Sequence, residues 1–127
     1  MKKNYIEELG YMAIGSRLKQ LTEVLMRDMV KVYKGFHVAF EPRWFTFIHL
    51  LNAQGEMSIS EIAGRLNQTH VAVNQVANSL EKKNIIVCRK DTADNRKRLI
   101  SLSKKGKRLV CELEPVWNAV EEAVGDL

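Results

Sequence analysis

Apolar residues recur at helical spacing along the first third of the chain. Leu18, Leu21, Leu25, Met29 and Val32 lie three or four positions apart, which predicts a long helix over residues 5–33. Further apolar side chains widen this surface beyond one stripe: Ile6, Leu9, Met12, Ile14, Val24 and Met26. A helix with so broad an apolar surface is more often packed against a partner than solitary. Gly35 is expected to end it.

A loop over residues 36–42 and a second helix over residues 43–54 are expected next. Pro42 disfavours a helical conformation at Glu41, so the helix should start after it. Apolar side chains cover most of the helix circumference, namely Trp44, Phe45, Phe47, Ile48, Leu50 and Leu51. This pattern predicts that the second helix is largely buried.

Two short helical segments separated by a tight turn follow. Ser58 or Ser60 can cap a helix over residues 59–66, and Thr69 can cap another that runs to about Lys83. Asn67 stands in the turn, where a positive φ is commonly needed and where Asn is tolerated better than most residues. The inward positions of the second helix would be Val73, Val76, Ala77 and Leu80. The pattern predicts a helix-turn-helix, although a buried pair of helices could imitate it.

The next segment decides between these two interpretations. Residues 85–90 and 97–102 are rich in β-branched and other apolar residues and predict two strands, and Asp91 to Asn95 have turn chemistry. Ser103 should cap a last helix, which Pro115 is expected to kink or interrupt. A helix-turn-helix followed directly by a basic hairpin is a winged helix. The predicted fold class is therefore mainly α with a small β-hairpin wing (α+β), a winged helix-turn-helix with long N- and C-terminal helices.

Charge is distributed unevenly along the chain. Lys and Arg number 20 against 15 Asp and Glu, a net charge of +5. Residues 82–108 carry eleven of the basic side chains against only Asp91 and Asp94, whereas residues 109–127 carry five acids and no base. Such a local excess is expected of a polyanion binder. The alternative is a solvated basic surface.

Composition also narrows the class of protein. The 127 residues suit one domain. No apolar run approaches the roughly 20 residues that cross a bilayer, and the N-terminus lacks an apolar signal core. We therefore expect a cytoplasmic protein with reduced cysteines, Cys88 and Cys111 being buried and inert. His37, His49 and His70 have no ligand-like spacing, and no Gly-rich phosphate-cradling stretch occurs, so we expect neither a metal site, a cofactor nor an enzyme.

The segment from Leu80 to Gly106 resembles the MarR family of winged helix-turn-helix transcription regulators. It is similar to the family signature of Leu-Glu, two residues and Gly-Leu-Val, then Asp-x-Arg in the wing, then Leu-Thr, two residues and Gly. Asn84 stands where the family usually has Gly, and Asn also tolerates a positive φ. Ser103 stands where the family usually has Thr, and Ser can also cap a helix. Residues 40–45 and 115–117 also resemble the N-terminal regulator half of proteins that fuse a MarR-like domain to a GNAT acetyltransferase. On that second resemblance the chain is a fragment or a shortened relative.

The family resemblance implies a homodimer that binds double-stranded DNA at a pseudo-palindromic operator. Helix 69–83 would enter the major groove and wing 85–102 the minor groove. The outward residues of that helix would then face DNA: Thr69, His70, Val71, Asn74, Gln75 and Asn78. Arg96 would occupy the wing tip beside Asp94, with Arg89, Lys90, Lys97 and Arg98 near phosphates. The alternatives are an ordinary polar helix face and an exposed surface ion pair.

The same resemblance assigns the domain's parts. Helices 5–33 and 103–127 would dimerise, and residues 43–102 would form the DNA-binding lobe. The dimer surface would use Ile6, Leu9 and Met12 from the first helix and Leu109, Leu113, Val116, Trp117 and Val120 from the last. The pocket for a small-molecule effector would be lined by Met12, Phe36, Phe40, Trp44, Phe45 and Trp117. Aromatic residues at helical spacing are, however, more often ordinary core residues.

Two other functions remain open at this point. One is a non-catalytic regulatory or dimerisation module of a GNAT acetyltransferase fusion. The other is a protein-interaction winged helix that has lost DNA binding, which the basic wing disfavours.

Overall fold

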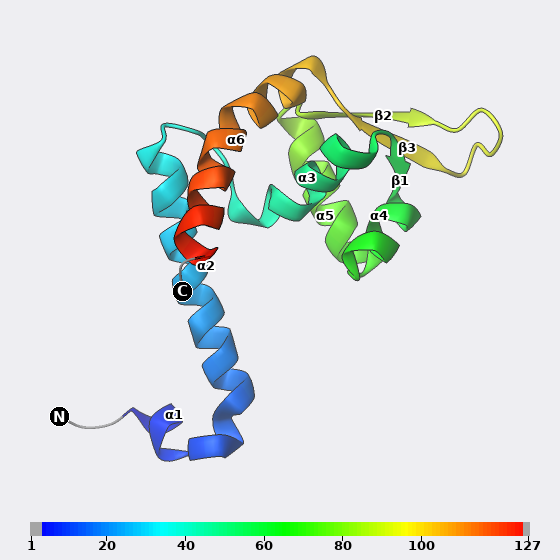
Figure 1. Cartoon of the computed structure of the whole chain (residues 1–127). Helices are drawn as coiled ribbons and strands as arrows, with labels where there is room; N and C mark the ends of the chain where they lie inside the picture. Colours follow the sequence, from blue (N-terminus) through cyan, green and yellow to red (C-terminus); the bar gives the residue numbers. More distant parts are fainter. Residues whose placement is uncertain (1–3, 126–127) are drawn as a thin grey trace. The chain divides into compact units, whose positions relative to one another are not determined.

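The computed structural model describes residues 4–125, which form mainly helices and one small sheet (Figure 1). The elements in chain order are α1 (Tyr5–Glu8), η1 (Gly10–Ala13), α2 (Ile14–Gly35), η2 (Pro42–Trp44), α3 (Phe45–Gln54), β1 (Met57–Ser58), α4 (Ile59–Leu66), α5 (His70–Lys82), β2 (Ile86–Lys90), β3 (Arg98–Leu102) and α6 (Lys104–Gly125). The chain divides into two compact units, one ending at Pro42 and the other beginning at Arg43. None of the helices within residues 4–125 is long and apolar enough to cross a membrane.

The first unit contains three helical pieces, so the single helix predicted over residues 5–33 is wrong. Gly10 adopts a φ of +60°, a left-handed conformation that ends α1 and that Gly adopts without steric cost. Ala13 then leaves the helical region, with φ −94° and ψ 20°, before α2 begins. Asn4 caps α1 by accepting a hydrogen bond from the Glu7 amide at 3.0 Å. The helix expected from the apolar pattern is therefore α2 alone.

The end of α2 is stabilised by the residues that follow it, which fold back onto Tyr33. His37 has a φ of +59° just after Gly35, as expected of a helix end. The Val38 amide then donates to the Tyr33 carbonyl at 3.1 Å. The Tyr33 and Phe40 rings lie 4.7 Å apart, and both side chains are buried. By contrast, the middle of α2 leaves Leu18, Leu21 and Leu25 more than half exposed.

The core of the second unit is assembled from its helices and the sheet. Its fully or nearly buried side chains include Trp44, Phe47, Ile48, Leu51, Met57, Ile62, Ala63, Val73, Ala77, Leu80, Ile85, Ile86, Ile100, Val110, Leu113 and Val116. The second predicted helix is confirmed as α3, but the chain enters it through η2, and Phe45 is 38% exposed. The helical spacing of the apolar residues therefore predicted the core of this unit well.

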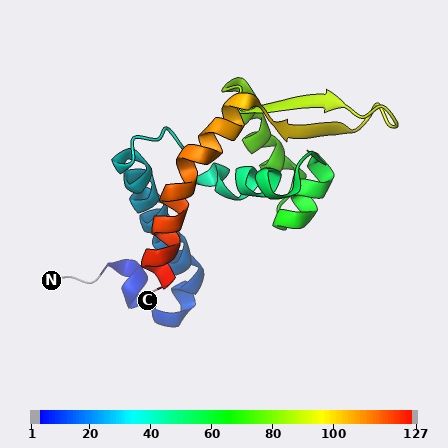
Figure 2. The same cartoon turned by 45° about the horizontal axis from the view of Figure 1, so that its top comes forward.

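The sheet has three antiparallel strands in the order β1-β3-β2. The expected hairpin is confirmed, with Ile86 opposite Leu102, Cys88 opposite Ile100 and Lys90 opposite Arg98. The third strand, β1, was not predicted because two residues cannot show a periodic pattern. Figures 1 and 2 both show β2 and β3 extending as an arm away from α3, α4 and α5.

The start of α6 is joined closely to the end of α5 and the start of β2. Asn84 has a φ of +61°, and the Ser103 hydroxyl donates to its carbonyl at 2.6 Å. The same hydroxyl oxygen accepts from the Gly106 amide at 3.0 Å, which confirms Ser103 as the helix cap. A Cβ on Gly106 would lie only 2.2 Å from the Ile85 carbonyl oxygen. The helix then continues through Pro115 without the interruption allowed for there.

Candidate nucleic-acid interface

The geometry of α4 and α5 is set by three local signals in the sequence. The Ser58 hydroxyl oxygen accepts from the Glu61 amide at 3.1 Å and caps α4. Asn67 ends that helix in the left-handed region, with φ 52° and ψ 45°. The Thr69 hydroxyl oxygen accepts from the Ala72 amide at 3.1 Å and caps α5. Each cap satisfies an amide that the first helical turn would leave unpaired, so the predicted helix-turn-helix is confirmed.

The two faces of α5 differ as the sequence predicted. Val73, Ala77 and Leu80 are buried on one side, while Val76 is only half-buried. On the opposite side Val71 is 67% exposed. Four residues spaced three or four positions apart form an exposed stripe along α5. They are Val71, Gln75, Asn78 and Lys82.

Three of the remaining candidates lie at the edges of that stripe. Thr69 and His70 are exposed where α5 begins. Asn74 is half-buried and does not face fully outward as expected. It follows Val73 directly, so at about 100° of rotation per residue it lies on the flank of the helix.

The loop at the end of the β2–β3 arm is organised by two aspartates. The Asp91 carboxylate accepts from the Ala93 amide at 2.9 Å, and the Asp94 carboxylate accepts from the Arg96 amide at 3.0 Å. The Arg96 side chain is 93% exposed, and its Nε lies 3.5 Å from Asp94 Oδ1. The pairing of Asp94 with Arg96 expected from the sequence is thus present. A pair this exposed contributes only ~0–1 kcal/mol to stability.

Two arginines of the arm are held by carboxylates that the sequence did not indicate. Arg89 donates to both Glu56 oxygens, at 2.8 and 2.5 Å, from β2 to the turn before β1. Its hydrogen bonds lower the pKa of the Glu56 carboxyl below the ordinary value. Arg98 donates to Glu81 at 3.1 Å, which ties the arm to the end of α5. These pairs join residues 33 and 17 positions apart, so sequence spacing could not reveal them.

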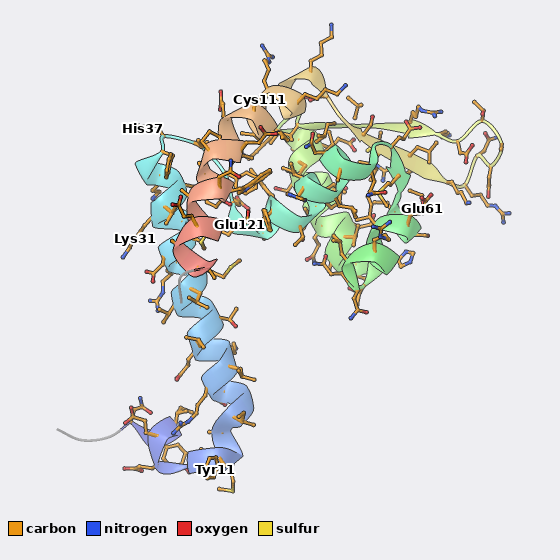
Figure 3. All side chains as sticks on the ribbon, in the orientation of Figure 1. Tyr11, Lys31, His37, Glu61, Cys111 and Glu121 are labelled. Atoms are coloured by element: carbon orange, nitrogen blue, oxygen red, sulfur yellow. The ribbon has the colours of Figure 1, made fainter. Side chains whose placement is uncertain are left out.

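The two cysteines differ in their surroundings. Cys88 is half-buried and its thiol donates to the Glu81 carboxylate at 2.9 Å. Burial first, and then the Glu81 carboxylate, raise the pKa of this thiol, which disfavours the reactive thiolate. Cys111 is exposed on α6, so its expected burial is wrong (Figure 3). Within the described part of the chain, no group of His, Cys, Asp and Glu side chains could hold a metal ion.

The residues expected to line an effector site are divided between the two units. Phe45 and Trp117 meet edge to face at 5.3 Å, and His49, which the sequence did not single out, lies 5.4 Å from Trp117. Trp44 is a core residue, 2% exposed. In the first unit, Met12 and Phe36 are exposed and Phe40 is buried.

Part of the predicted dimer surface is also corrected. Leu113 and Val116 are fully buried, because α6 packs against α3 within the second unit. They are therefore core residues. Ile6, Leu9, Leu109, Trp117 and Val120 are partly exposed, and Met12 is 82% exposed.

A helix-turn-helix followed directly by a β arm defines a winged helix-turn-helix protein. Residues 41–97 match the model of the MarR family. No curated protein matches the sequence.

Solved structures share the fold at low sequence identity. The MepR–DNA complex from S. aureus has a TM-score of 0.74 at 21% identity over 90% of this chain and 84% of that one. YusO from Bacillus subtilis has a TM-score of 0.65 at 24% identity over 96% and 84%. BpsR from Bordetella bronchiseptica, whose DNA binding is regulated by 6-hydroxynicotinic acid, has a TM-score of 0.65 at 20% identity over 84% and 83%.

Proposed function

We propose that this chain is a sequence-specific regulator of transcription that binds double-stranded DNA as a homodimer. Helix α5 would lie in the major groove and the β2–β3 arm in the minor groove. The observation that carries this proposal is the exposed stripe on α5, which presents two amides and an apolar side chain beside a basic arm. The exposed Arg96 at the end of that arm completes the arrangement.

The chemistry of the stripe suits the edges of bases. Gln75 and Asn78 can each donate to and accept from an adenine, and Val71 can contact a thymine methyl group. Thr69, His70 and the flanking Asn74 would contact the first bases or phosphates near the start of α5. Each bidentate amide contributes about 1–3 kcal/mol of discrimination against a wrong base.

The arm would act through its tip and its exposed lysines. Asp94 directs Arg96, whose guanidinium would enter a narrow A·T-rich minor groove where negative potential is concentrated. Lys90 and Lys97 are exposed and would contact phosphates. Glu56 and Glu81 form ion pairs with Arg89 and Arg98, so these arginines would mainly fix the direction of the arm. They would contact phosphates only while still paired with these carboxylates.

Dimer formation would bring two such surfaces to a palindromic site. The exposed apolar side chains of α2, including Leu18, Leu21 and Leu25, support a protein partner for this helix. We assign α1, η1, α2 and α6 to the dimer contacts and residues 43–102 to the DNA-binding lobe. A two-fold dimer matches half-sites about one helical turn apart.

An effector would bind near the aromatic side chains of α3 and α6. Phe45, His49 and Trp117 offer ring faces and an imidazole within one cluster, which suits a small aromatic molecule. The effect of ligand on BpsR gives a precedent within the same fold.

The proposal is tested by selecting duplexes from a random pool and measuring affinity by fluorescence anisotropy. The wild type should prefer the selected duplex over a scrambled one. Gln75→Ala should weaken binding to the selected duplex by about tenfold, the lower part of the range for one bidentate contact, and leave the scrambled duplex nearly unaffected. Asn118→Ala, an exposed amide on α6, is the matched control. Equal behaviour of the two variants would contradict the assignment of α5 as the reading helix.

A further inference from the structure

An open hollow of about 630 Å³ lies beside the exposed stripe of α5. Its lining comes from η2, from the middle and end of α5 and from the residue that follows α5: Arg43, Gln75, Asn78, Ser79, Lys82 and Lys83. These residues include three cations and no carboxylate. Arg43 is far from the others in the sequence, so only the fold brings the set together.

The cations of this basic hollow are positioned by their neighbours. Arg43 Nη2 donates to the Ser79 hydroxyl at 3.1 Å, which holds the guanidinium over α5. The Lys83 ammonium lies 5.9 Å from the centroid of the Trp44 ring, within range of a cation–π contact. Glu81, the acid next to Lys82, accepts hydrogen bonds from Arg98 and Cys88. Its negative charge is therefore engaged at the arm.

The side chains of the basic hollow are suited to phosphate oxygens. A guanidinium, two ammonium groups and a hydroxyl can all donate hydrogen bonds, and charged donors bind phosphate most strongly. Gln75 and Asn78 belong both to this hollow and to the stripe that would face bases. A phosphodiester in the hollow would consequently lie next to the bases that α5 contacts.

We propose that the basic hollow clamps a backbone phosphate of the bound DNA strand and so fixes the position of α5 along the major groove. This inference rests on the proposed DNA-binding function. It adds a contact centred on Arg43, Ser79, Lys82 and Lys83. The sequence marked Lys82 and Lys83 only as part of a basic run and gave no signal for Arg43 or Ser79. Phosphate contacts of this kind set register and orientation without reading sequence.

The test compares hollow variants with a matched control on two DNA probes. Arg43→Gln and Lys82→Gln remove one positive charge each from the hollow, and Lys107→Gln removes one from an exposed lysine of α6 outside its lining. Affinities are measured by anisotropy, from about 50 to 200 mM KCl, on a selected duplex and on a scrambled duplex of equal length. Circular dichroism melting first verifies that each variant folds.

Both hollow variants should bind the two duplexes more weakly than the wild type does. The loss of affinity should be the same for each duplex, about three- to tenfold. The slope of log affinity against log salt should become shallower by ~0.9 for each phosphate that the variant no longer neutralises. Lys107→Gln should retain wild-type affinity and slope. An equal loss of affinity for both duplexes distinguishes a backbone clamp from a base-reading contact. Loss of a base-reading contact would lower the affinity for the selected duplex alone.

Three results would overturn the clamp. Hollow variants that match Lys107→Gln while the wild type still prefers the selected duplex would refute the clamp and leave the proposed function standing. Weakening confined to the selected duplex would make the residue a base reader. Inorganic phosphate could instead change the tryptophan fluorescence of the wild type but not of Arg43→Gln. If the variant also kept its DNA affinity, the hollow would be assigned to free phosphate. A wild type that binds neither duplex would refute the proposed function itself.

Discussion

Replacing Gly106 with Ala tests how α6 is joined to the DNA-binding lobe. Gly106 lies in the first turn of α6, where its amide donates to the Ser103 cap. The added Cβ would lie 2.2 Å from the Ile85 carbonyl oxygen and 3.3 Å from a Leu102 methyl group. Because the Ile85 oxygen belongs to the backbone at the start of β2, no flexible side chain can move aside.

The magnitude follows from two opposing effects. Ala is favoured over Gly within a helix by at most about 1 kcal/mol. Against this, forcing extra volume into a packed site costs about 1–3 kcal/mol, and displacing the Ser103 cap costs about 1 kcal/mol more. The net expectation for Gly106→Ala is a fall in stability of about 1–3 kcal/mol, a decrease in Tm of roughly 4–12 °C for a chain of this size.

The assay is thermal unfolding by circular dichroism at one protein concentration, since dimerisation would make Tm concentration-dependent. Gly64→Ala is the matched control, because Gly64 lies within α4 and a Cβ there meets no atom within 4 Å. That variant should gain up to about 1 kcal/mol. A Gly106→Ala protein as stable as Gly64→Ala would refute the close approach of α6 to β2.

Three further predictions concern the arm and α5. Arg96→Ala should weaken DNA binding tenfold or more without lowering Tm, because its side chain is 93% exposed; unchanged affinity in an anisotropy titration would remove Arg96 from the interface. Glu56→Gln should lower Tm at pH 7 but not in acid: the pKa of Glu56 is lowered from 4.5 in the folded protein, so its stabilisation is present above about pH 4.5 and is lost as pH falls through the lowered pKa. A Tm difference that persists at low pH would contradict the Arg89 pairing. Thr69→Ala should destabilise the protein by about 1 kcal/mol through removal of the α5 cap, while Thr69→Ser, which keeps the hydroxyl, should restore most of it in urea unfolding.

Local chemistry made the helix-turn-helix predictable from the sequence. Ser58 and Thr69 act as caps within three residues of the amides they bind. Asn67 and Asn84 adopt the positive φ expected of them. In each case the residue type and its immediate neighbours are sufficient to determine the conformation.

Features that depend on distant residues could not be predicted in this way. The preference against Gly in a helix is about 1 kcal/mol, too small to show that the helix would break at Gly10. Strand β1 exists only because Met57 and Ser58 pair with Ile100 and Leu99. The basic hollow needs Arg43 beside α5, which again only the folded chain provides.

Residue exposure was harder to infer than helix position. Leu113 and Val116 fit the apolar pattern of a dimer surface as well as that of a core, and they are core residues. Cys111 was expected inside because cysteine is commonly buried, yet it lies on the exposed side of α6. Helical periodicity shows that a face is apolar but not which neighbour covers it.

The most direct test of the central claim is the ratio of wild-type affinities for the selected duplex and the scrambled duplex, measured by anisotropy at a fixed salt concentration of about 0.15 M. A sequence-specific regulator should bind the selected duplex at least about a thousandfold more tightly, as specific DNA-binding proteins do. Equal affinity for both duplexes, or no binding to either, would contradict the account of α5 as a helix that reads DNA sequence.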